Sequence, residues 1–164
     1  MEIRVLGCHG ADCLGDTTER PLRRESCGFL VDRSVLLDAG TVGARLTLAE
    51  QRGIRVVLLS HLHFDHIKGL PTLADNLAEQ FDAPLIVAGT EPVIHGLMDH
   101  VFNNKVYPNF FEIPNRKRPV LHARVLEPGK TVTLGHLDVT PVPVNHIVPT
   151  VGYVVNNGRE AFLY

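Results

Sequence analysis

Residues 60–66 read Ser-His-Leu-His-Phe-Asp-His, and they follow directly on an unbroken apolar run of the kind that forms a strand covered on both faces. Alternate side chains of an extended chain share a face, so His61 and His63 can reach one cation together. A turn after them would direct Asp65 and His66 towards a neighbouring cation. Imidazole nitrogen and carboxylate oxygen together suit Zn²⁺, with Mn²⁺ or Fe²⁺ as alternatives.

Two simpler interpretations of this cluster stay open on sequence alone. The histidines could hydrogen-bond within a polar loop, or they could hold a purely structural zinc ion. A structural zinc site is normally closed by four ligands, often cysteines, whereas Cys8, Cys13 and Cys27 lie elsewhere in the chain. Their spacing is not that of a disulfide framework, and we expect reduced thiols. The ligand density favours a catalytic metal centre.

The flanking sequence predicts strands and helices in a definite order. Asp32-Arg33 separates two apolar segments as a turn would, Gly53 stops a helical pattern, and Thr90 can cap a helix with Pro92 in its first turn. The aperiodic stretch 103–119 predicts a long loop. We expect strands over residues 2–7, 27–31, 34–40, 55–60 and 83–89, helices over 42–52, 68–81 and 90–102, and strands only from residue 121 onward.

This order favours a sheet with helices on one side and a second sheet on the other, as one domain over residues 1–164. The composition is 45% hydrophobic and 21% charged with a formal charge of −2, as in ordinary globular proteins. Such a near-neutral balance predicts no stable binding to long nucleic acid. The sequence begins without a signal-like segment and has no apolar stretch of about eighteen residues, so we expect a cytoplasmic protein without a membrane partner.

The motif His-Leu-His-Phe-Asp-His matches the HxHxDH signature of the metallo-β-lactamase superfamily of metal-dependent hydrolases. The segment SVLLDAG is similar to the family's strand that ends in a buried aspartate, which makes Asp38 an orienting residue. Gly69 stands where the family often has glycine, and PVNHIVPTVGYVV is similar to the segment that supplies the family's next histidine, here His146. The resemblance implies an α/β fold, the metallo-β-lactamase αββα sandwich.

By the same resemblance, two divalent metal ions are expected, with zinc as the favoured metal. His61, His63 and His146 would hold the first ion, and Asp65 and His66 would hold part of the second. Asp65 is also the expected catalytic residue, because it could orient the attacking hydroxide. The reaction would be hydrolysis by a metal-activated hydroxide, without a serine or cysteine nucleophile.

In the family, a later aspartate bridges both metals and a further histidine completes the second site. This sequence stops at Tyr164, inside a predicted strand and before either residue. We therefore expect a domain whose C-terminal part is missing, with a weakly held second metal. The exposed strand edge predicts self-association, as in a homo-oligomer, or pairing with another chain.

Residues 95–110 resemble the helix and asparagine-containing loop of class II cyclic-nucleotide phosphodiesterases. Residues 69–76, GLPTLADN, are instead similar to ribonuclease Z. The favoured interpretation is a phosphodiesterase acting on a small-molecule phosphodiester, a 3',5'-cyclic nucleotide. The alternatives are a lactonase, a thioesterase, a ribonuclease Z-like enzyme that processes RNA ends, or a non-catalytic metal-binding fragment.

Overall fold

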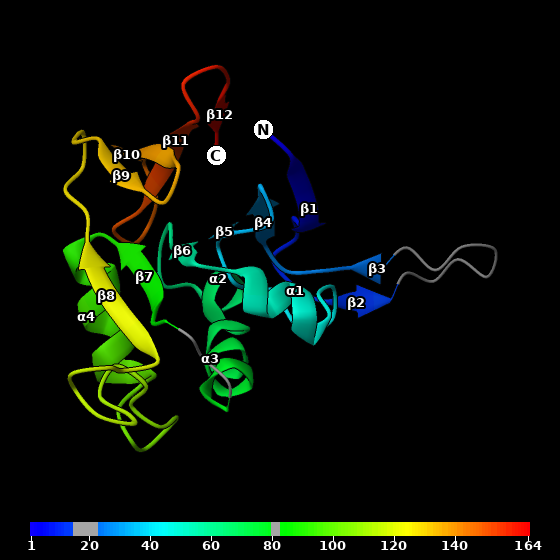
Figure 1. The fold of residues 1–164 in the computed structure, drawn as a ribbon. Helices are drawn as coiled ribbons and strands as arrows, with labels where there is room; N and C mark the ends of the chain where they lie inside the picture. Colours follow the sequence, from blue (N-terminus) through cyan, green and yellow to red (C-terminus); the bar gives the residue numbers. More distant parts are fainter. Residues whose placement is uncertain (15–22, 80–82) are drawn as a thin grey trace.

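Two large β-sheets, a short two-stranded ribbon and one layer of helices make up the computed structural model, which describes residues 1–14, 23–79 and 83–164 (Figure 1). The described residues form a six-stranded sheet of order β1-β4-β5-β6-β7-β8, a four-stranded sheet of order β12-β11-β10-β9, and the ribbon β2-β3. The large sheet contains β1 (Ile3–Gly7), β4 (Gly28–Val31), β5 (Val35–Leu37), β6 (Val56–Leu58), β7 (Leu85–Gly89) and β8 (Leu121–Val125). The others are β2 (Cys13–Leu14), β3 (Arg23–Arg24), β9 (Val132–Leu134), β10 (Leu137–Pro143), β11 (Val151–Asn156) and β12 (Ala161–Leu163).

The predicted hairpin is confirmed: β4 pairs antiparallel with β5. Residues 32–34 connect them, and Ser34 N donates to the Val31 carbonyl oxygen at 3.1 Å. Asp32 and Arg33 are the central residues of this turn, with φ angles of 44° and 57°, the left-handed conformation that matches strand twist. From β5 onward the large sheet is parallel through β6, β7 and β8. Parallel neighbours need long crossovers, and each of the three, between β5 and β6, between β6 and β7 and between β7 and β8, contains at least one helix.

The helices are α1 (Leu48–Gly53), α2 (Phe64–Ile67), α3 (Leu70–Ala78) and α4 (Glu91–His100). The helix expected over 42–52 was placed too early, because Thr47 and Glu50 form a capping box that begins α1 at Leu48. The helix expected over 68–81 begins at Leu70, after the separate short helix α2, and its expected end at residues 80–81 lies outside the described residues. Thr90 is the N-cap of α4, as predicted.

The core has two parts, one on each face of the large sheet. Along β6, Val57 packs into the cluster that includes the helices, whereas Val56 and Leu58 pack towards the four-stranded sheet. Both faces of β6 are covered, which explains its unbroken apolar sequence. Tyr153 is fully buried between the sheets, and its hydroxyl donates to the Leu59 carbonyl oxygen at 2.7 Å.

This arrangement contains three consecutive layers of the predicted αββα sandwich: helices, large sheet and small sheet. All helical residues in the core belong to the cluster on the helix side of the large sheet. In the part of the chain that the structure describes, no helix combines the length and the apolar character needed to cross a membrane. The loop predicted at 103–119 is confirmed as turns without regular secondary structure.

Candidate metal centre

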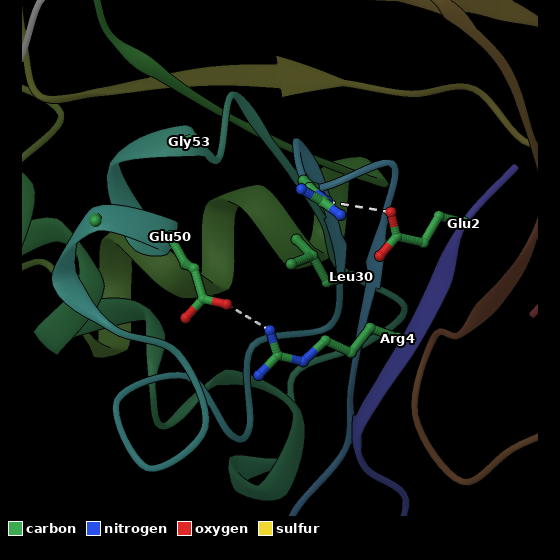
Figure 2. A pocket seen from close by; sticks show the side chains of 7 residues that line it. Glu2, Arg4, Leu30, Glu50 and Gly53 are labelled. Carbon is green, nitrogen blue, oxygen red and sulfur yellow. Dashed lines mark hydrogen bonds and ion pairs between the residues drawn. The ribbon is translucent and has the colours of Figure 1, made fainter.

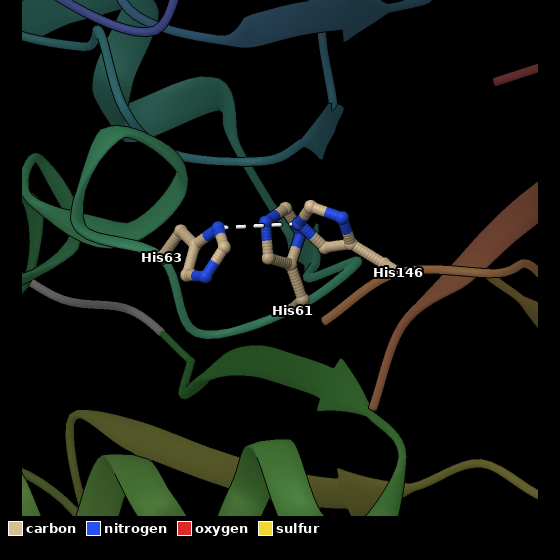
Figure 3. A group of neighbouring side chains, drawn as sticks. All are labelled: His61, His63 and His146. Atoms are coloured by element: carbon tan, nitrogen blue, oxygen red, sulfur yellow. Dashed lines mark hydrogen bonds between the residues drawn. The ribbon is translucent and has the colours of Figure 1, made fainter. Parts of the chain in front are cut away.

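The histidine-rich segment begins just beyond the C-terminal end of β6, where the two sheets meet. The Ser60 carbonyl oxygen accepts from the Val151 backbone N–H at 3.1 Å, so the first strand residue after the loop 144–150 is fixed against this segment. His146 lies in that loop, between β10 and β11. Chain segments distant in sequence, one from each sheet, thereby meet at one point (Figure 3).

His61, His63 and His146 form a compact cluster in which each offers a ring nitrogen within 4.8 Å of the others. The Nδ1 atom of His63 lies 3.3 Å from Nε2 of His146, and Figure 3 shows these nitrogens converging beside His61. The Nε2 atom of His61 is buried and has no hydrogen-bond partner among the described residues. A buried polar atom without a partner is costly, and a cation coordinated by three imidazoles would satisfy it.

One buried carboxylate, Asp38, determines the tautomers around this cluster. Its Oδ2 atom accepts from Ser60 Oγ at 2.6 Å and from His66 Nδ1 at 2.5 Å, and its Oδ1 accepts from Ser60 N at 2.8 Å. The Ser60 hydroxyl donates its one hydrogen to Asp38, so its oxygen accepts the hydrogen bond from His61 Nδ1 at 2.9 Å. The Nε2 atoms of neutral His61 and His66 are therefore left with lone pairs, as metal ligands require.

Asp65 and His66 occupy the short helix α2 and face each other, with Asp65 Oδ2 3.3 Å from His66 Nε2. A carboxylate oxygen and a bare imidazole nitrogen are both acceptors, so this approach requires a proton or a cation between them. A proton or a metal cation between these two atoms would each place a positive charge there. The His66 ring lies 4.1 Å from the His61 ring, measured between centroids, so this pair adjoins the three-histidine cluster.

The glycine at position 40 explains how α2 is held so close to the end of β5. A Cβ at Gly40 would lie only 1.7 Å from the Asp65 carbonyl oxygen, and one at Gly69 would lie 2.7 Å from the Ala39 carbonyl oxygen. Ala39 N also donates to the His66 carbonyl oxygen at 2.7 Å. The motif is thus fixed by backbone contacts that only glycine permits.

Burial and neighbouring charges shift the pKa values of two site histidines in opposite directions. Burial, reinforced by the neighbouring histidines, lowers the pKa of His61 to about 4, so its imidazole is neutral and able to bind a cation at neutral pH. Burial also lowers the pKa of His66, but the hydrogen bond and charge of Asp38, with the charge of Asp65, outweigh it and raise the pKa overall. His66 therefore takes up a proton more readily than an unperturbed imidazole does, whereas His61 takes one up less readily.

Sequence reasoning missed the residues that surround Asp38 from other elements. The Tyr164 hydroxyl donates to Asp38 Oδ2 at 2.5 Å and lies 3.3 Å from Cys27 Sγ. Burial, with the charges of Asp38 and Asp65, raises the pKa of Cys27 despite the Tyr164 contact, which keeps it a thiol. Cys27, Asp38 and His66 also lie within 4.8 Å of one another, but Asp38 is already satisfied by its donors. Of the residues that contact Asp38, Ser60 could have been suspected from the sequence, because it directly precedes the histidine motif.

A cavity of about 450 Å³ opens over the cluster and is lined by all five predicted ligands, His61, His63, Asp65, His66 and His146. The structure therefore brings together every residue predicted for the site. No residue of the loop 103–119, whose sequence resembles a phosphodiesterase loop, lines this cavity.

A separate cavity of about 460 Å³ lies between α1 and the strands β1 and β4 and shares no residue with the histidine site (Figure 2). Its charged side chains are already paired: Arg4 contacts Glu50 at 2.5 Å and Arg33 contacts Glu2 at 3.1 Å. Because these ion pairs satisfy one another, the histidine cluster is the stronger candidate for a functional site.

The amino-acid sequence is similar to those of a known family and of several known enzymes. The family model described as "Beta-lactamase superfamily domain" matches residues 33–164. A 3',5'-cyclic-nucleotide phosphodiesterase of Schizosaccharomyces pombe is 35% identical over 100 residues, which cover 60% of this chain and 27% of that protein. A ribonuclease Z of Methanococcus maripaludis is 31% identical over 112 residues, covering 65% of this chain and 33% of the relative. The chain spans about a third or less of the length of these two relatives.

Among solved structures, unliganded yeast PDE1 superposes with a TM-score of 0.75 over 98% of this chain and 63% of that one. The sequence identity is 18%, so this likeness concerns the fold. The metallo-beta-lactamase fold protein YhfI of Bacillus subtilis also superposes, with a TM-score of 0.69 over 99% of this chain and 61% of that one, at 18% identity. This likeness confirms the predicted metallo-β-lactamase fold.

Proposed function

Because the chain belongs to the beta-lactamase superfamily domain family, we propose that the protein is a divalent-metal-dependent hydrolase that cleaves phosphodiesters, with a 3',5'-cyclic nucleotide as the favoured substrate. One observation carries the proposal. The buried Nε2 atom of His61, without a hydrogen-bond partner among the described residues, faces the ring nitrogens of His63 and His146.

The residues present fit the divalent-metal binding that the family's fold implies. His61, His63 and His146 would hold one ion through imidazole nitrogens, and Asp65 and His66 would hold part of a second. This donor set suits Zn²⁺, with Mn²⁺ or Fe²⁺ as alternatives. The opposed acceptors of Asp65 and His66, 3.3 Å apart, support a cation at the second position.

A bound divalent cation would make water nucleophilic at neutral pH and offset the charge that develops on phosphorus. The chain's own residues would prepare this chemistry. Asp65 would accept a hydrogen bond from the attacking water and orient it, while Asp38 keeps the Nε2 atoms of His61 and His66 free to bind. No serine or cysteine nucleophile is required, which agrees with Cys27 being held as a thiol.

The phosphodiester is favoured because both relatives described above are named for phosphodiester chemistry. Ribonuclease Z-like processing of RNA is the second candidate, supported by several relatives of that name. A formal charge of −2 and a pI near 6.5 favour the small substrate, because binding to an RNA backbone is driven by positive charge. A cytoplasmic location remains a prediction.

The test combines metal analysis with a substrate panel. Purified protein reconstituted with Zn²⁺ or Mn²⁺ is assayed for metal content and for turnover of cyclic AMP, cyclic GMP, bis(p-nitrophenyl) phosphate and a precursor RNA. We expect metal-dependent cleavage of the cyclic nucleotides and the chromogenic diester. Turnover of RNA alone would select the second candidate, and bound metal with no turnover of any substrate would indicate a binding module.

Two matched variants separate the metal centre from general effects on the fold. His61→Gln should abolish metal binding and turnover together. His122→Gln, an exposed histidine on the edge strand β8, should leave both unchanged. Wild-type metal content in His61→Gln would remove the basis of the proposal.

A further inference from the structure

Residues 8–12, which connect β1 to β2, lie beside the Asp65 side chain, although the sequence gave no reason to place them at the site. A Cβ on Gly10 would have Asp65 Oδ2 as its nearest neighbour outside the adjoining residues, at 3.7 Å. The same oxygen is the one that faces His66 Nε2. The backbone at Gly10 therefore adjoins the carboxylate that would hold part of the second cation.

The carboxylate of Asp12 holds this segment in place through both of its oxygens. Its Oδ1 atom accepts from the Ser26 backbone N–H at 2.7 Å and from the Ser26 hydroxyl at 2.8 Å, and its Oδ2 atom forms an ion pair with Lys68 Nζ. Because Ser26 is fully buried, both of its donors depend on Asp12 as their acceptor. The hydrogen bonds from Lys68 and Ser26 lower the pKa of Asp12, which is a carboxylate at neutral pH.

The two partners of Asp12 belong to the two segments that fix the backbone around Asp65. Lys68 is the C-cap of α2, the helix that carries Asp65. Ser26 precedes Cys27, whose N–H donates to the Asp65 carbonyl oxygen at 3.2 Å. Asp12 therefore joins the end of this helix to the strand segment against which Asp65 is held.

The three-histidine cluster is built without this link. His61 and His63 follow β6, and His146 lies in the loop 144–150. Among the described residues, none of the segment 8–12 lines the cavity over the cluster or forms a hydrogen bond with these histidines. Loss of Asp12 should therefore affect the second cation position and leave the first unchanged.

We propose that Asp12 is a positioning residue for the second cation, because it ties residues 8–12 and Ser26 to the end of α2 and so holds the Asp65 carboxylate beside His66. The inference rests on the metal centre of the proposed function and identifies what keeps its second ligand pair in place. An exposed ion pair alone contributes little. Asp12 differs from such a pair because it also accepts two hydrogen bonds from a buried residue.

Asp12→Asn tests the link to Lys68. The asparagine carbonyl oxygen can still accept from Ser26, whereas its NH₂ group would face Lys68 Nζ, which is also a donor. Zinc titration against a competing chelator should show the second equivalent bound about ten-fold more weakly, the lower end of the effect of a lost partner behind a metal ligand, and the first equivalent unchanged. In ¹³C spectra of the metal-free protein, the Asp65 carboxyl resonance should shift.

Two further variants separate this contact from general effects on the fold. Lys68→Met should weaken the second equivalent as Asp12→Asn does, and the double variant should show no additional loss because both changes remove the same contact. Glu112→Gln is the matched control, because it removes an exposed ion pair with Arg116 at 2.7 Å in the loop 103–119, none of which lines the metal-centre cavity. It should leave both zinc affinities and the Asp65 resonance unchanged.

Three results would overturn the inference: equal weakening of both equivalents in Asp12→Asn, wild-type affinity for the second equivalent in that variant, or a wild-type protein that binds a single equivalent. If Asp12→Asn does not fold, Lys68→Met measures the same contact from the helix side. Selective loss of the second equivalent in a protein that cleaves no phosphodiester retains this inference and loses the proposed substrate chemistry. Metal-dependent turnover with an unchanged second equivalent in Asp12→Asn does the reverse.

Discussion

Asp38→Asn tests most directly how the metal centre is prepared. The wild-type carboxylate is fully buried and accepts hydrogen bonds from Ser60, His66 and Tyr164. Asparagine keeps the shape but replaces one acceptor oxygen with an amide NH₂ group, which only donates. If its carbonyl oxygen remains on Ser60 N, the NH₂ faces His66 Nδ1. That nitrogen must then accept, and the proton of neutral His66 moves to Nε2, next to Asp65.

The expected magnitudes follow from the bonds that change. Hydrogen bonds to a charged group contribute about 1.5–3 kcal/mol and neutral ones about 0.5–1.5 kcal/mol. Exchanging the carboxylate should therefore lower the free energy of unfolding of the metal-free protein by about 2 kcal/mol. A lost partner behind a metal ligand typically costs about 10–100-fold in metal affinity. The larger loss should fall on the cation held by Asp65 and His66.

The tautomer is measured by ¹⁵N imidazole spectra of the metal-free protein, above the pH at which His66 is protonated. We expect the proton on Nδ1 in the wild type and on Nε2 in Asp38→Asn. Urea unfolding gives the stability change, and competition with a zinc chelator gives the affinity.

Asp32→Asn is the control, because Asp32 also contacts a histidine, His136, at 3.0 Å but at the surface. Its effect on stability should stay below about 1 kcal/mol, with no effect on zinc. An unchanged His66 tautomer in Asp38→Asn, together with wild-type zinc affinity, would refute the reasoning.

Three further predictions concern stability. The pKa of His61 falls from 6.5 to about 4 on folding, so below pH 6.5 the unfolded chain binds a proton that the folded chain does not. The free energy of unfolding should therefore fall by up to about 3 kcal/mol as the pH falls to 4. Urea titrations should show a weaker dependence of stability on pH for His61→Gln. Gly40→Ala should cost about 3 kcal/mol or more, because its Cβ would overlap the Asp65 carbonyl oxygen, whereas Gly43→Ala, with nothing within 4 Å, should be nearly neutral in the same assay. Tyr153→Phe removes a 2.7 Å bond between the sheets and should cost about 1–3 kcal/mol in urea, so unchanged stability would contradict it.

The sequence predicted the part of the site that lies within one short segment, because residue spacing indicates which nearby side chains share a face. His61 and His63 share a face of an extended segment, and Asp65 and His66 follow in the next turn, so spacing alone brought them together. His146 lies 83 positions from His63 along the chain, and only resemblance to a family identified it. The contacts that place it, such as Val151 N to the Ser60 carbonyl oxygen, depend on how the two sheets pack.

Two further features of the structure were not predicted: one was visible in the sequence, and the other was not. The capping box of Thr47 and Glu50 was present in the sequence, yet apolar periodicity placed the start of α1 several residues too early. The contact of Tyr164 with Asp38 and Cys27 joins three distant segments through side chains. No periodicity or motif marks such a contact, because it arises only when the small sheet closes over the large one.

The position of His146 leads to a last prediction about how metal and fold are coupled. His61 and His63 follow a strand of the large sheet, whereas His146 lies in the exposed loop between two strands of the small sheet. A cation shared by all three would therefore cross-link the two layers. A ligand that binds only the folded state stabilises it by about 2.7 kcal/mol at a hundred times its dissociation constant. Zinc should accordingly raise the melting temperature and slow amide hydrogen exchange in residues 144–150. His146→Gln should lose most of both effects while His61 and His63 still retain weak zinc binding. Equal zinc stabilisation in the wild type and in His146→Gln would mean that the loop does not contribute a ligand, and the first metal position would have to be assigned without it.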